Sequence, residues 1–392
     1  MTVTADVVVL GAGVTGCSIA YRLARAGQDV VVVERGHLSS GSSGACDGYI
    51  AHQTKRPGVH LDLALSSVKM VAELSEELGY DVQYNRCGSL IIIRGAEQWA
   101  VMEKHSGEQR AGGLDVQMLD RKAVQEAEPF LSGDFDGATY CALDGRADPL
   151  SIAHGFHKAA VQHGARFMFY SEATSVEVKG NRVVGVKTAQ GRIACDTLIV
   201  ACGVWTPEIL RPLGIDVPIK PRRGFVMVTE QVPHTLNNLI LDARYIAIKM
   251  GVSVGAEDDP VNRYGIGLSL EQTHSGNILI GNTRQFVGFD TRISPEILEA
   301  MRLYTLSVAP KLAGFSIIRT FAGLRPYTPD GLPLLGPVDG FEGLVLAAGH
   351  EGDGIALSPI TGRLISDYLH SGRIPADMQP CLPQRFVRRT MG

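Results

Sequence analysis

The stretch ADVVVLGAGVTGCSIAYRLARAGQDVVVVE, residues 5–34, decides the fold of this chain. It opens with an apolar run rich in β-branched residues, which is typical of a strand buried in a parallel sheet. A glycine motif, GAGVTG at 11–16, follows at once, and then a segment of helical character that stops at Gly27. A second apolar strand over 29–33 ends at Glu34. This order is that of a whole β-α-β unit, and it predicts a Rossmann-like α/β domain.

The glycine motif carries a chemical expectation as well as a fold. Its glycines let the backbone approach a pyrophosphate, and the following helix offers unpaired N–H groups at its N-terminus. Glu34 can accept hydrogen bonds from a ribose, and an acid there suits FAD or NAD better than NADP. The alternative reading is a tight strand-to-helix turn without a ligand. We therefore predict dinucleotide binding.

Composition limits the other possibilities. With 392 residues, 45% hydrophobic and 20% charged, the chain can form a large core and two domains. A net charge of −4 and the lack of a basic run argue against nucleic acid or an anionic membrane as partner. The chain starts without the pattern of a signal peptide and has no transmembrane segment, so we expect a cytoplasmic protein. The seven scattered cysteines argue against disulfides, zinc or an iron-sulfur cluster, and no metal site is expected.

The rest of the chain returns to the nucleotide domain in pieces. The small-residue loop over 39–50 is flexible enough to wrap a long cofactor, or it is a linker. A hairpin with its turn at 180–181 and a strand within 196–206 follow a long insertion. A strand over 344–348 leads into GHEGDG at 349–354, and we expect a helix from Ser358 to Leu369 with Pro359 near its start. Strand character at 223–229 and 276–281 lies outside this domain.

The ordered motifs GAGVTG (11–16), SSGACDG (42–48), VACGVW (200–205), FAGLRPYTPDGLPLLG (321–336) and GHEGDGIALSPITG (349–362) resemble a known family. It is the FAD-dependent amino-acid oxidases and dehydrogenases of the D-amino-acid oxidase superfamily, and the resemblance covers nearly the whole chain. Within that family the chain resembles glycine oxidase, and more closely the flavin subunits of hydrogen cyanide synthase, opine oxidase and D-hydroxyproline dehydrogenase. The resemblance implies a discontinuous FAD-binding domain (1–50, 145–221 and 320–392). It also implies a substrate domain built on an antiparallel sheet (51–144 and 222–319).

The resemblance assigns the FAD contacts residue by residue. The pyrophosphate, ribose, adenine and flavin ring are expected to meet a set drawn from all the motifs: Gly11, Gly13, Val14, Thr15, Gly16, Glu34, Arg35, Ser42, Ser43, Asp47, Gly48, Tyr49, Ala173, Val176, Gly203, Gly323, His350, Glu351, Gly352, Asp353, Gly354, Ile355 and Ala356.

The resemblance also names a substrate pocket. Arg325 matches the family position that binds the substrate carboxylate, for which a guanidinium supplies two parallel donors. Tyr245 matches a pocket tyrosine that can bond the same carboxylate, although a core tyrosine is an equal alternative. The remaining predicted pocket residues are His52, His350 and Glu351.

Gly352 departs from glycine oxidase, which has a second arginine there. The departure favours a larger substrate or another donor, for which His52, Arg222 and Arg223 are candidates. We expect the acids on either side, Glu351 and Asp353, to turn outward, to bond backbone N–H groups, or to orient a substrate amine.

The activity implied is oxidation of the C–N bond of an amino or imino acid by hydride transfer to flavin N5, with electrons passed to a partner subunit or another acceptor. One alternative is a self-sufficient oxidase that uses O2 and releases H2O2. Another is a non-catalytic FAD-binding interaction subunit. Glycine, D-proline, D-hydroxyproline and an opine all stay open as substrates, as does covalent attachment of FAD, and we expect an oligomer.

Overall fold

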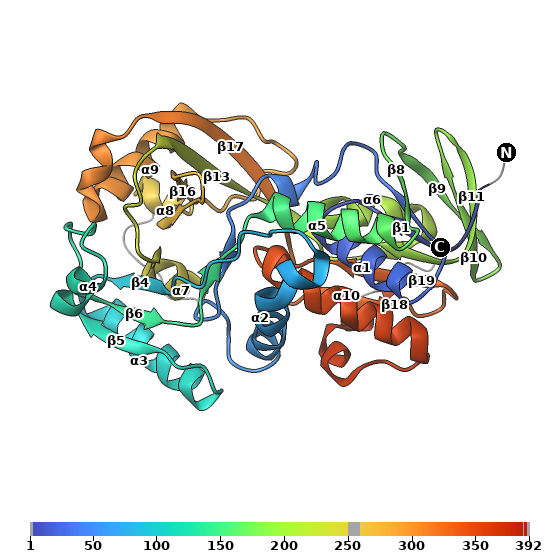
Figure 1. Ribbon diagram of the computed structural model, residues 1–392, viewed down its shortest axis with the longest axis horizontal. Helices are drawn as coiled ribbons and strands as arrows, with labels where there is room; N and C mark the ends of the chain where they lie inside the picture. The colour runs from blue at the N-terminus through green and yellow to red at the C-terminus, as the bar shows by residue number, and fades with distance from the viewer. Residues whose placement is uncertain (1–2, 250–258, 387, 390–392) are drawn as a thin grey trace.

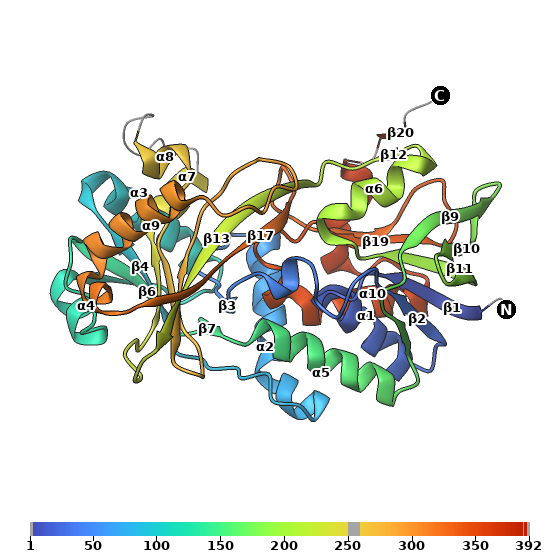
Figure 2. The same ribbon diagram turned by 90° about the horizontal axis from the view of Figure 1, so that it is seen from above.

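Figures 1 and 2 show the computed structural model, which describes residues 3–249, 259–386 and 388–389. The chain forms two lobes, and helix α2 lies at their junction in both views. Each lobe contains one sheet of eight strands among the described residues. The α-helices are Val14–Arg25 (α1), Val59–Leu78 (α2), Gly95–Ala111 (α3), Arg121–Ala127 (α4), Pro149–Gln162 (α5), Thr206–Leu210 (α6), Ala243–Lys249 (α7), Pro260–Arg263 (α8), Pro295–Val308 (α9) and Gly354–Ser371 (α10).

The strands are as follows: Val3–Leu10 (β1), Val30–Val33 (β2), Tyr49–Ile50 (β3), Ser89–Ile93 (β4), Gln117–Asp120 (β5), Gly137–Cys141 (β6), Gly145–Arg146 (β7), Arg166–Met168 (β8), Ala173–Lys179 (β9), Arg182–Thr188 (β10), Gly191–Val200 (β11), Ile215–Asp216 (β12), Lys220–Gln231 (β13), Leu239–Asp242 (β14), Ser269–Gln272 (β15), Asn277–Gly281 (β16), Ile317–Tyr327 (β17), Leu334–Pro337 (β18), Leu344–Ala348 (β19) and Arg388–Arg389 (β20).

The first sheet has the order β18-β19-β11-β1-β2-β8, with the β9-β10 hairpin joined to β11. Strands β19, β11, β1, β2 and β8 run parallel. Val7 and Val9 of β1 pack into a core with the helices, whereas Val8 and Leu10 pack into a second core on the opposite face. Both faces of β1 are therefore covered, which is why its sequence is apolar without alternation. The predicted α/β fold is confirmed, as are both strands and the helix of the β-α-β unit.

Helices α1, α5 and α10 pack together against this sheet. Gly362 lets α10 approach α1 closely, because a Cβ there would lie 2.3 Å from Ser18 Oγ. The last glycine of the GHEGDGIALSPITG segment thus serves helix packing.

Helix α10 corrects the expected start at Ser358. It begins at Gly354, so Pro359 lies inside it. Proline has no N–H to give to the carbonyl four residues earlier, which would break the ladder at Ile355 O. The Ser358 hydroxyl donates to that carbonyl instead, at 2.9 Å. The N-terminus of the helix therefore lies within the glycine loop itself.

The second sheet has the order β17-β13-β16-β15-β14-β4-β6-β5 and is largely antiparallel. The strand expected at 223–229 lies within β13. The strand expected at 276–281 coincides with β16, except that β16 begins at Asn277. Strands β13 and β17 pair along most of their length and point from the second lobe toward the first. The predicted domain boundaries after 221 and 319 fall inside these two strands, and those boundaries stay predictions.

Within the described parts of the chain, none of the helices has both the length and the apolar character needed to cross a bilayer.

Candidate functional site

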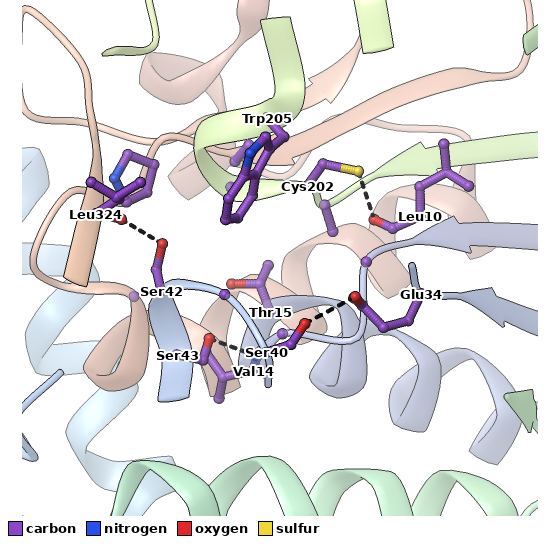
Figure 3. A pocket seen from close by; sticks show the side chains of 18 of the residues that line it. Leu10, Val14, Thr15, Glu34, Ser40, Ser42, Ser43, Cys202, Trp205 and Leu324 are labelled. Atoms are coloured by element: carbon purple, nitrogen blue, oxygen red, sulfur yellow. Dashed lines mark hydrogen bonds between the residues drawn. The ribbon is translucent and has the colours of Figure 1, made fainter. Parts of the chain in front are cut away.

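A cavity of about 440 Å³ lies between the two lobes, within the usual size range of ligand sites. Its walls come from the β1-α1 loop, the segment over 34–47, the start of β9, the residues after β11, the facing ends of β13 and β17, and the loop before α10. Figure 3 shows the part of the wall near Leu10, Ser42 and Trp205.

The first glycine loop forms one end of the cavity. Gly11 has a φ of 102°, and a Cβ there would lie 2.6 Å from the carbonyl oxygen of Ala201. Gly13 is the N-cap residue of α1. Gly11, Gly13, Val14 and Thr15 line the cavity, so the N-terminal turn of α1 faces it.

Gly16 has a different task from the glycines that line the cavity. It is absent from the described cavity wall, and a Cβ on it would lie only 2.0 Å from the carbonyl oxygen of Gly11. Gly16 thus has a packing role, which keeps the loop folded against α1, and its predicted FAD contact stays a prediction.

Glu34 holds the same loop from the end of β2. Its carboxylate accepts the N–H of Ala12 at 2.9 Å, the N–H of Gly36 at 2.8 Å and the hydroxyl of Ser40 at 3.1 Å, the last of which is drawn in Figure 3. Glu34 and Arg35 both line the cavity. Glu34 thus holds the first glycine loop in shape and also faces the cavity.

The second loop covers the first through its two serines. The Ser43 hydroxyl accepts the N–H of Val14 at 3.1 Å, and the Ser42 hydroxyl donates to the carbonyl of Leu324 in β17 (Figure 3). A Cβ on Gly323 would meet the carbonyl oxygen of Ala45 at 2.0 Å, so this glycine lets β17 approach the loop. The loop therefore joins the two lobes at the wall of the cavity.

The chain leaves the cavity after Asp47, which lines it. The N–H of Gly48 donates to the carboxyl of Glu271 at 2.8 Å, and the Tyr49 hydroxyl donates to the carbonyl of Leu270 at 2.7 Å. Neither Gly48 nor Tyr49 is part of the described wall, because both are engaged with the second sheet.

The buried carboxyl of Glu271 and the partly buried carboxyl of Asp47 influence each other at this exit. Burial raises the pKa of Asp47 against the opposing effect of Arg325. Burial and the neighbouring Asp47 raise the pKa of Glu271 to about 8. Glu271 was not predicted from the sequence, since nothing in its strand marks one residue for a partner more than 200 positions away.

A further part of the cavity wall is formed by β9 and the turn after β11, which lies beside the first glycine loop. Three of the positions expected to contact FAD line the cavity here: Ala173, Val176 and Gly203. Trp205 lines it as well, and the Arg35 guanidinium lies 4.1 Å from the centre of the indole ring. Sequence reasoning quoted Trp205 within a motif but assigned it no role.

The last glycine loop lines the cavity with His350, Glu351, Gly352, Gly354 and Ile355. The loop also places a helix N-terminus at the wall, because α10 begins at Gly354. Ala356 is outside the described wall, and its carbonyl accepts the hydroxyl of Ser67 in α2 at 2.6 Å.

His350 is buried, and its Nε2 lies 3.0 Å from the Thr361 hydroxyl. Burial lowers the pKa of His350 to about 4, although Asp353 acts in the other direction. The imidazole is therefore neutral near pH 7.

The two acids of this loop face opposite ways. Glu351 lines the cavity and forms an ion pair with Arg222 of β13. Asp353 is outside the described wall and forms an ion pair with Lys55, and its other carboxylate oxygen lies 2.7 Å from His60 Nε2 in α2. Of the three expectations for these acids, a bond to a backbone N–H holds for Glu351, whose carboxylate accepts the N–H of Gly352 at 2.6 Å. The cations that meet the two carboxylates were not predicted, and orientation of a substrate amine stays a prediction.

Arg325 lines the cavity beside this loop. Its Nη1 donates to the carbonyl of Thr283 at 3.0 Å. The guanidinium packs directly against Gly224 on β13, where a Cβ would lie only 2.2 Å from Nη1. A Cβ on Gly352 would lie 3.7 Å from the Arg325 side chain, so the missing second arginine leaves open space beside the first.

Arg222 and Arg223 face opposite sides of β13, as successive residues of a strand must. Arg222 is the cross-strand partner of Arg325 and reaches Glu351. Arg223 donates to the side chain of Gln285 at 2.9 Å and forms an ion pair with Asp290. Of the two candidate donors, only Arg222 lies at the cavity loop.

His52 does not add to the described wall. His52 is buried, and its Nδ1 lies 2.7 Å from the Asp144 carboxylate, away from the cavity. Tyr245 belongs to α7, but its side chain lies outside the described residues, so its role stays a prediction.

Comparison with known proteins agrees with this geometry. Residues 6–368 match the family described as FAD dependent oxidoreductase. The chain is 30% identical to the hydrogen cyanide synthase subunit HcnC of Pseudomonas protegens, over 97% of this chain and 96% of that protein. It is 31% identical to the glycine oxidase of Pseudomonas aeruginosa, over 96% and 98%. The crystal structure of glycine oxidase from Geobacillus kaustophilus superposes with a TM-score of 0.87 and 25% identity, and covers all of both chains.

The residues of the cavity fit FAD. The glycine cradle at 11–13 admits main chain close to a ligand, the first turn of α1 faces the space, and a second helix N-terminus lies at the last loop. The chain belongs to the FAD dependent oxidoreductase family, and the predicted family and cofactor are confirmed.

Proposed function

We propose that this chain, as an FAD-dependent oxidoreductase, oxidises the C–N bond of an amino or imino acid. The observation that carries the proposal is Arg325, whose guanidinium lies in the cavity wall beside the loop that precedes α10. A fixed cation in a partly closed cavity is suited to a carboxylate, and a planar guanidinium can hold both of its oxygens. Relatives named glycine oxidase support an amino acid as the owner of that carboxylate.

The cofactor would be held along the wall already described. The first turn of α1, with Gly11, Gly13, Val14 and Thr15, would meet the pyrophosphate, and Ser42 and Ser43 would close over it. Glu34 and Arg35 would face the ribose, and Ala173 with Val176 the adenine. When bound, FAD would supply the hydride acceptor.

The last loop would serve the electron-accepting edge of the flavin. The first turn of α10 brings backbone N–H groups and the positive end of the helix dipole to the cavity wall at Gly354 and Ile355. Donors fixed where negative charge gathers on reduction stabilise the reduced state without having to reorganise. His350 contributes no charge there at neutral pH, because its pKa is lowered to about 4.

Arg325 would orient the substrate. Its bond to the Thr283 carbonyl fixes one end of the guanidinium, which packs closely against Gly224, and Gly352 adds no side chain beside it. This orientation would bring the hydrogen on the substrate's α-carbon toward the flavin. Holding the reacting atoms close together lowers the barrier to hydride transfer.

The destination of the electrons is a separate part of the proposal. We favour a partner subunit, since one relative is named as a subunit of hydrogen cyanide synthase. The alternative is direct use of O2, as the name glycine oxidase implies for another relative. Oxygen consumption by the purified chain separates the two, because rapid turnover in air would contradict the need for a partner. The predicted cytoplasmic location and oligomer stay predictions.

The test is an anaerobic screen of the purified FAD-loaded protein against glycine and against amino and imino acids of both hands. We expect at least one to bleach the flavin absorbance. Arg325→Met should then lower the second-order rate constant of bleaching by about 100-fold, and Arg325→Lys should retain part of it. Bleaching by no compound would contradict the proposal and favour a non-catalytic FAD-binding subunit.

A further inference from the structure

We propose that Glu351, held by Arg222, receives the N–H of the substrate's amine while Arg325 holds its carboxylate. The inference rests on the proposed function and deepens it. It makes Glu351 a specificity-determining residue that selects compounds with an N–H next to the carboxylate-bearing carbon. Three observations carry it: the position of Glu351, its charge, and the partner that balances this charge.

The first observation is that Glu351 is fixed relative to Arg325. Glu351 lines the cavity, and its N–H donates to the carbonyl of Pro326 at 3.1 Å, next in the chain to Arg325. One carboxylate oxygen meets Arg222, and the other accepts the N–H of Gly352 at 2.6 Å. A carboxylate and a guanidinium are thus held at the same end of the cavity on adjacent segments.

The backbone supports this orientation. Glu351 has a φ of 51°, in the left-handed region that few residues other than glycine adopt. Such a conformation costs on the order of 1 kcal/mol or more and persists where the surroundings impose it. Here the imposed conformation turns the carboxylate toward Arg222 and the cavity, whereas Asp353, two residues later, turns toward Lys55.

The second observation is the charge of the carboxyl. Burial alone would raise the pKa of Glu351, but Arg222 and then Arg325 reverse this effect and lower it below its ordinary value. The group is therefore a carboxylate near pH 7 and can only accept hydrogen bonds. It repels a second substrate carboxylate and attracts an N–H.

The third observation is the balance provided by Arg222. A bare anion beside the amine would hold it as an ammonium ion, whose nitrogen has no free lone pair. Oxidation next to nitrogen needs that lone pair, because it forms the C=N bond as the C–H bond breaks. Arg222 neutralises much of the carboxylate's charge, since the side chains of this pair are only 16% and 12% exposed. Glu351 can then accept an N–H from the neutral amine.

The alternative is a structural ion pair that ties the last loop to β13. Both roles predict some loss of stability when the pair is broken. Only amine binding predicts that the loss of affinity depends on whether the ligand has an N–H.

The experiment compares wild type with Glu351→Gln, which keeps the shape and removes the charge. The amide oxygen of the variant can still accept from Arg222, whereas its NH2 group cannot accept the N–H of Gly352. Four probes are titrated anaerobically into the FAD-loaded enzyme: glycine against acetate, and proline against tetrahydrofuran-2-carboxylate, whose ring oxygen has no hydrogen to donate. Both kinds of affinity are measured through the flavin absorbance. For the amines, the affinity is the concentration at which the reduction rate reaches half its maximum. For the two analogues, it comes from the spectral shift on binding. We expect about 10-fold weaker binding of the amine that reduces the flavin and less than 2-fold change for its analogue.

The pH dependence gives a second readout. The charged groups facing Glu351 are Arg222 on β13, Arg325 on β17, Arg284 after β16 and Asp353 in its own loop. An anion favours the ammonium form of a bound amine, so Glu351→Gln should move the acidic limb of the reduction rate, at saturating substrate, to lower pH. A role in folding alone would leave this limb in place.

Equal weakening of amine and analogue, or no weakening of either, would overturn the inference while leaving the proposed function intact. If no amino or imino acid reduces the wild-type flavin, the proposed function fails first and the inference falls with it. Flavin content and thermal unfolding check that the variant is folded. If Glu351→Gln does not fold, the double variant Arg222→Gln/Glu351→Gln, which removes both charges together, replaces it with the same expected outcomes.

Discussion

The two glycine loops of the cavity are held in their conformations by different interactions. The first, Gly11–Gly16, is shaped by close packing of main chain: a Cβ on Gly16 would meet the carbonyl oxygen of Gly11 at 2.0 Å. The last, Gly349–Gly354, is shaped by charge, because its two acids are held by cations from other parts of the chain. The first loop is therefore shaped mainly by close contacts of its own main chain, whereas the last one depends on how the lobes meet.

The pairings of the last loop show why this difference matters. Arg222 comes from a strand of the second sheet, and Lys55 from the segment before α2. Lys55 and Asp353 are 4% and 13% exposed, so breaking this pair would leave a charge with little solvent around it. The loop that would meet the flavin edge is thus tied to both lobes, and a change in either lobe can reach it.

The largest effect should come from Gly16→Ala. The added Cβ would collide with the main chain of Gly11, which no side-chain movement can relieve. We expect the unfolding free energy to fall by about 3 kcal/mol or more, together with loss of bound FAD. Chemical unfolding and the flavin content of the purified protein measure both. A stable variant that keeps its FAD would show that the first loop can yield, and would remove the contrast with the last loop.

An intermediate effect should come from lowering the pH, through His350 of the last loop. Its pKa is about 4 in the folded protein, against about 6.5 when unfolded. Because the unfolded chain takes up the proton first, stability is fully present above pH 6.5 and falls as the pH drops toward 4, by up to about 3 kcal/mol.

Urea unfolding at pH 6.5 and pH 4.5 measures this dependence. His350→Gln, which can still bond the Thr361 hydroxyl, is the matched variant and should lose less stability between the two pH values. Parallel pH dependences of wild type and variant would rule out His350 as the source.

The smallest effect on the fold should come from Gly354→Ala. A Cβ there would lie 3.5 Å from the Cβ of His350, an ordinary contact, and the residue begins a helix. We expect the unfolding free energy to change by less than about 1 kcal/mol. Because Gly354 lines the cavity, FAD affinity or the reduction rate should fall a few-fold, and Gly354→Val should lower it further. An unchanged flavin in both variants would contradict a role for this loop at the cofactor.

Much of the candidate site follows from local patterns. The strand, glycine loop and helix of residues 5–26 are adjacent in sequence. The unbroken apolar run of the strand reflects burial on both faces of β1. Arg325, the last loop and the serines at 42–43 were located by ordered motifs, and Arg325, both serines and most of the loop line the cavity. The start of α10 was missed because Pro359 suggested a helix beginning, and the compensating bond from Ser358 depends on a side-chain rotamer.

What the sequence by itself determined is the family, the cofactor and the order of the elements, since these rest on short-range spacing of glycines and apolar residues. What only the tertiary structure decided is the direction in which individual polar side chains point. Glu351 faces the cavity and Asp353 faces α2, although the two have the same chemistry and lie two positions apart. His52 meets Asp144 instead of the cavity. The reason is that a charge is placed by its partner, and these partners come from segments about 90 to 300 residues away.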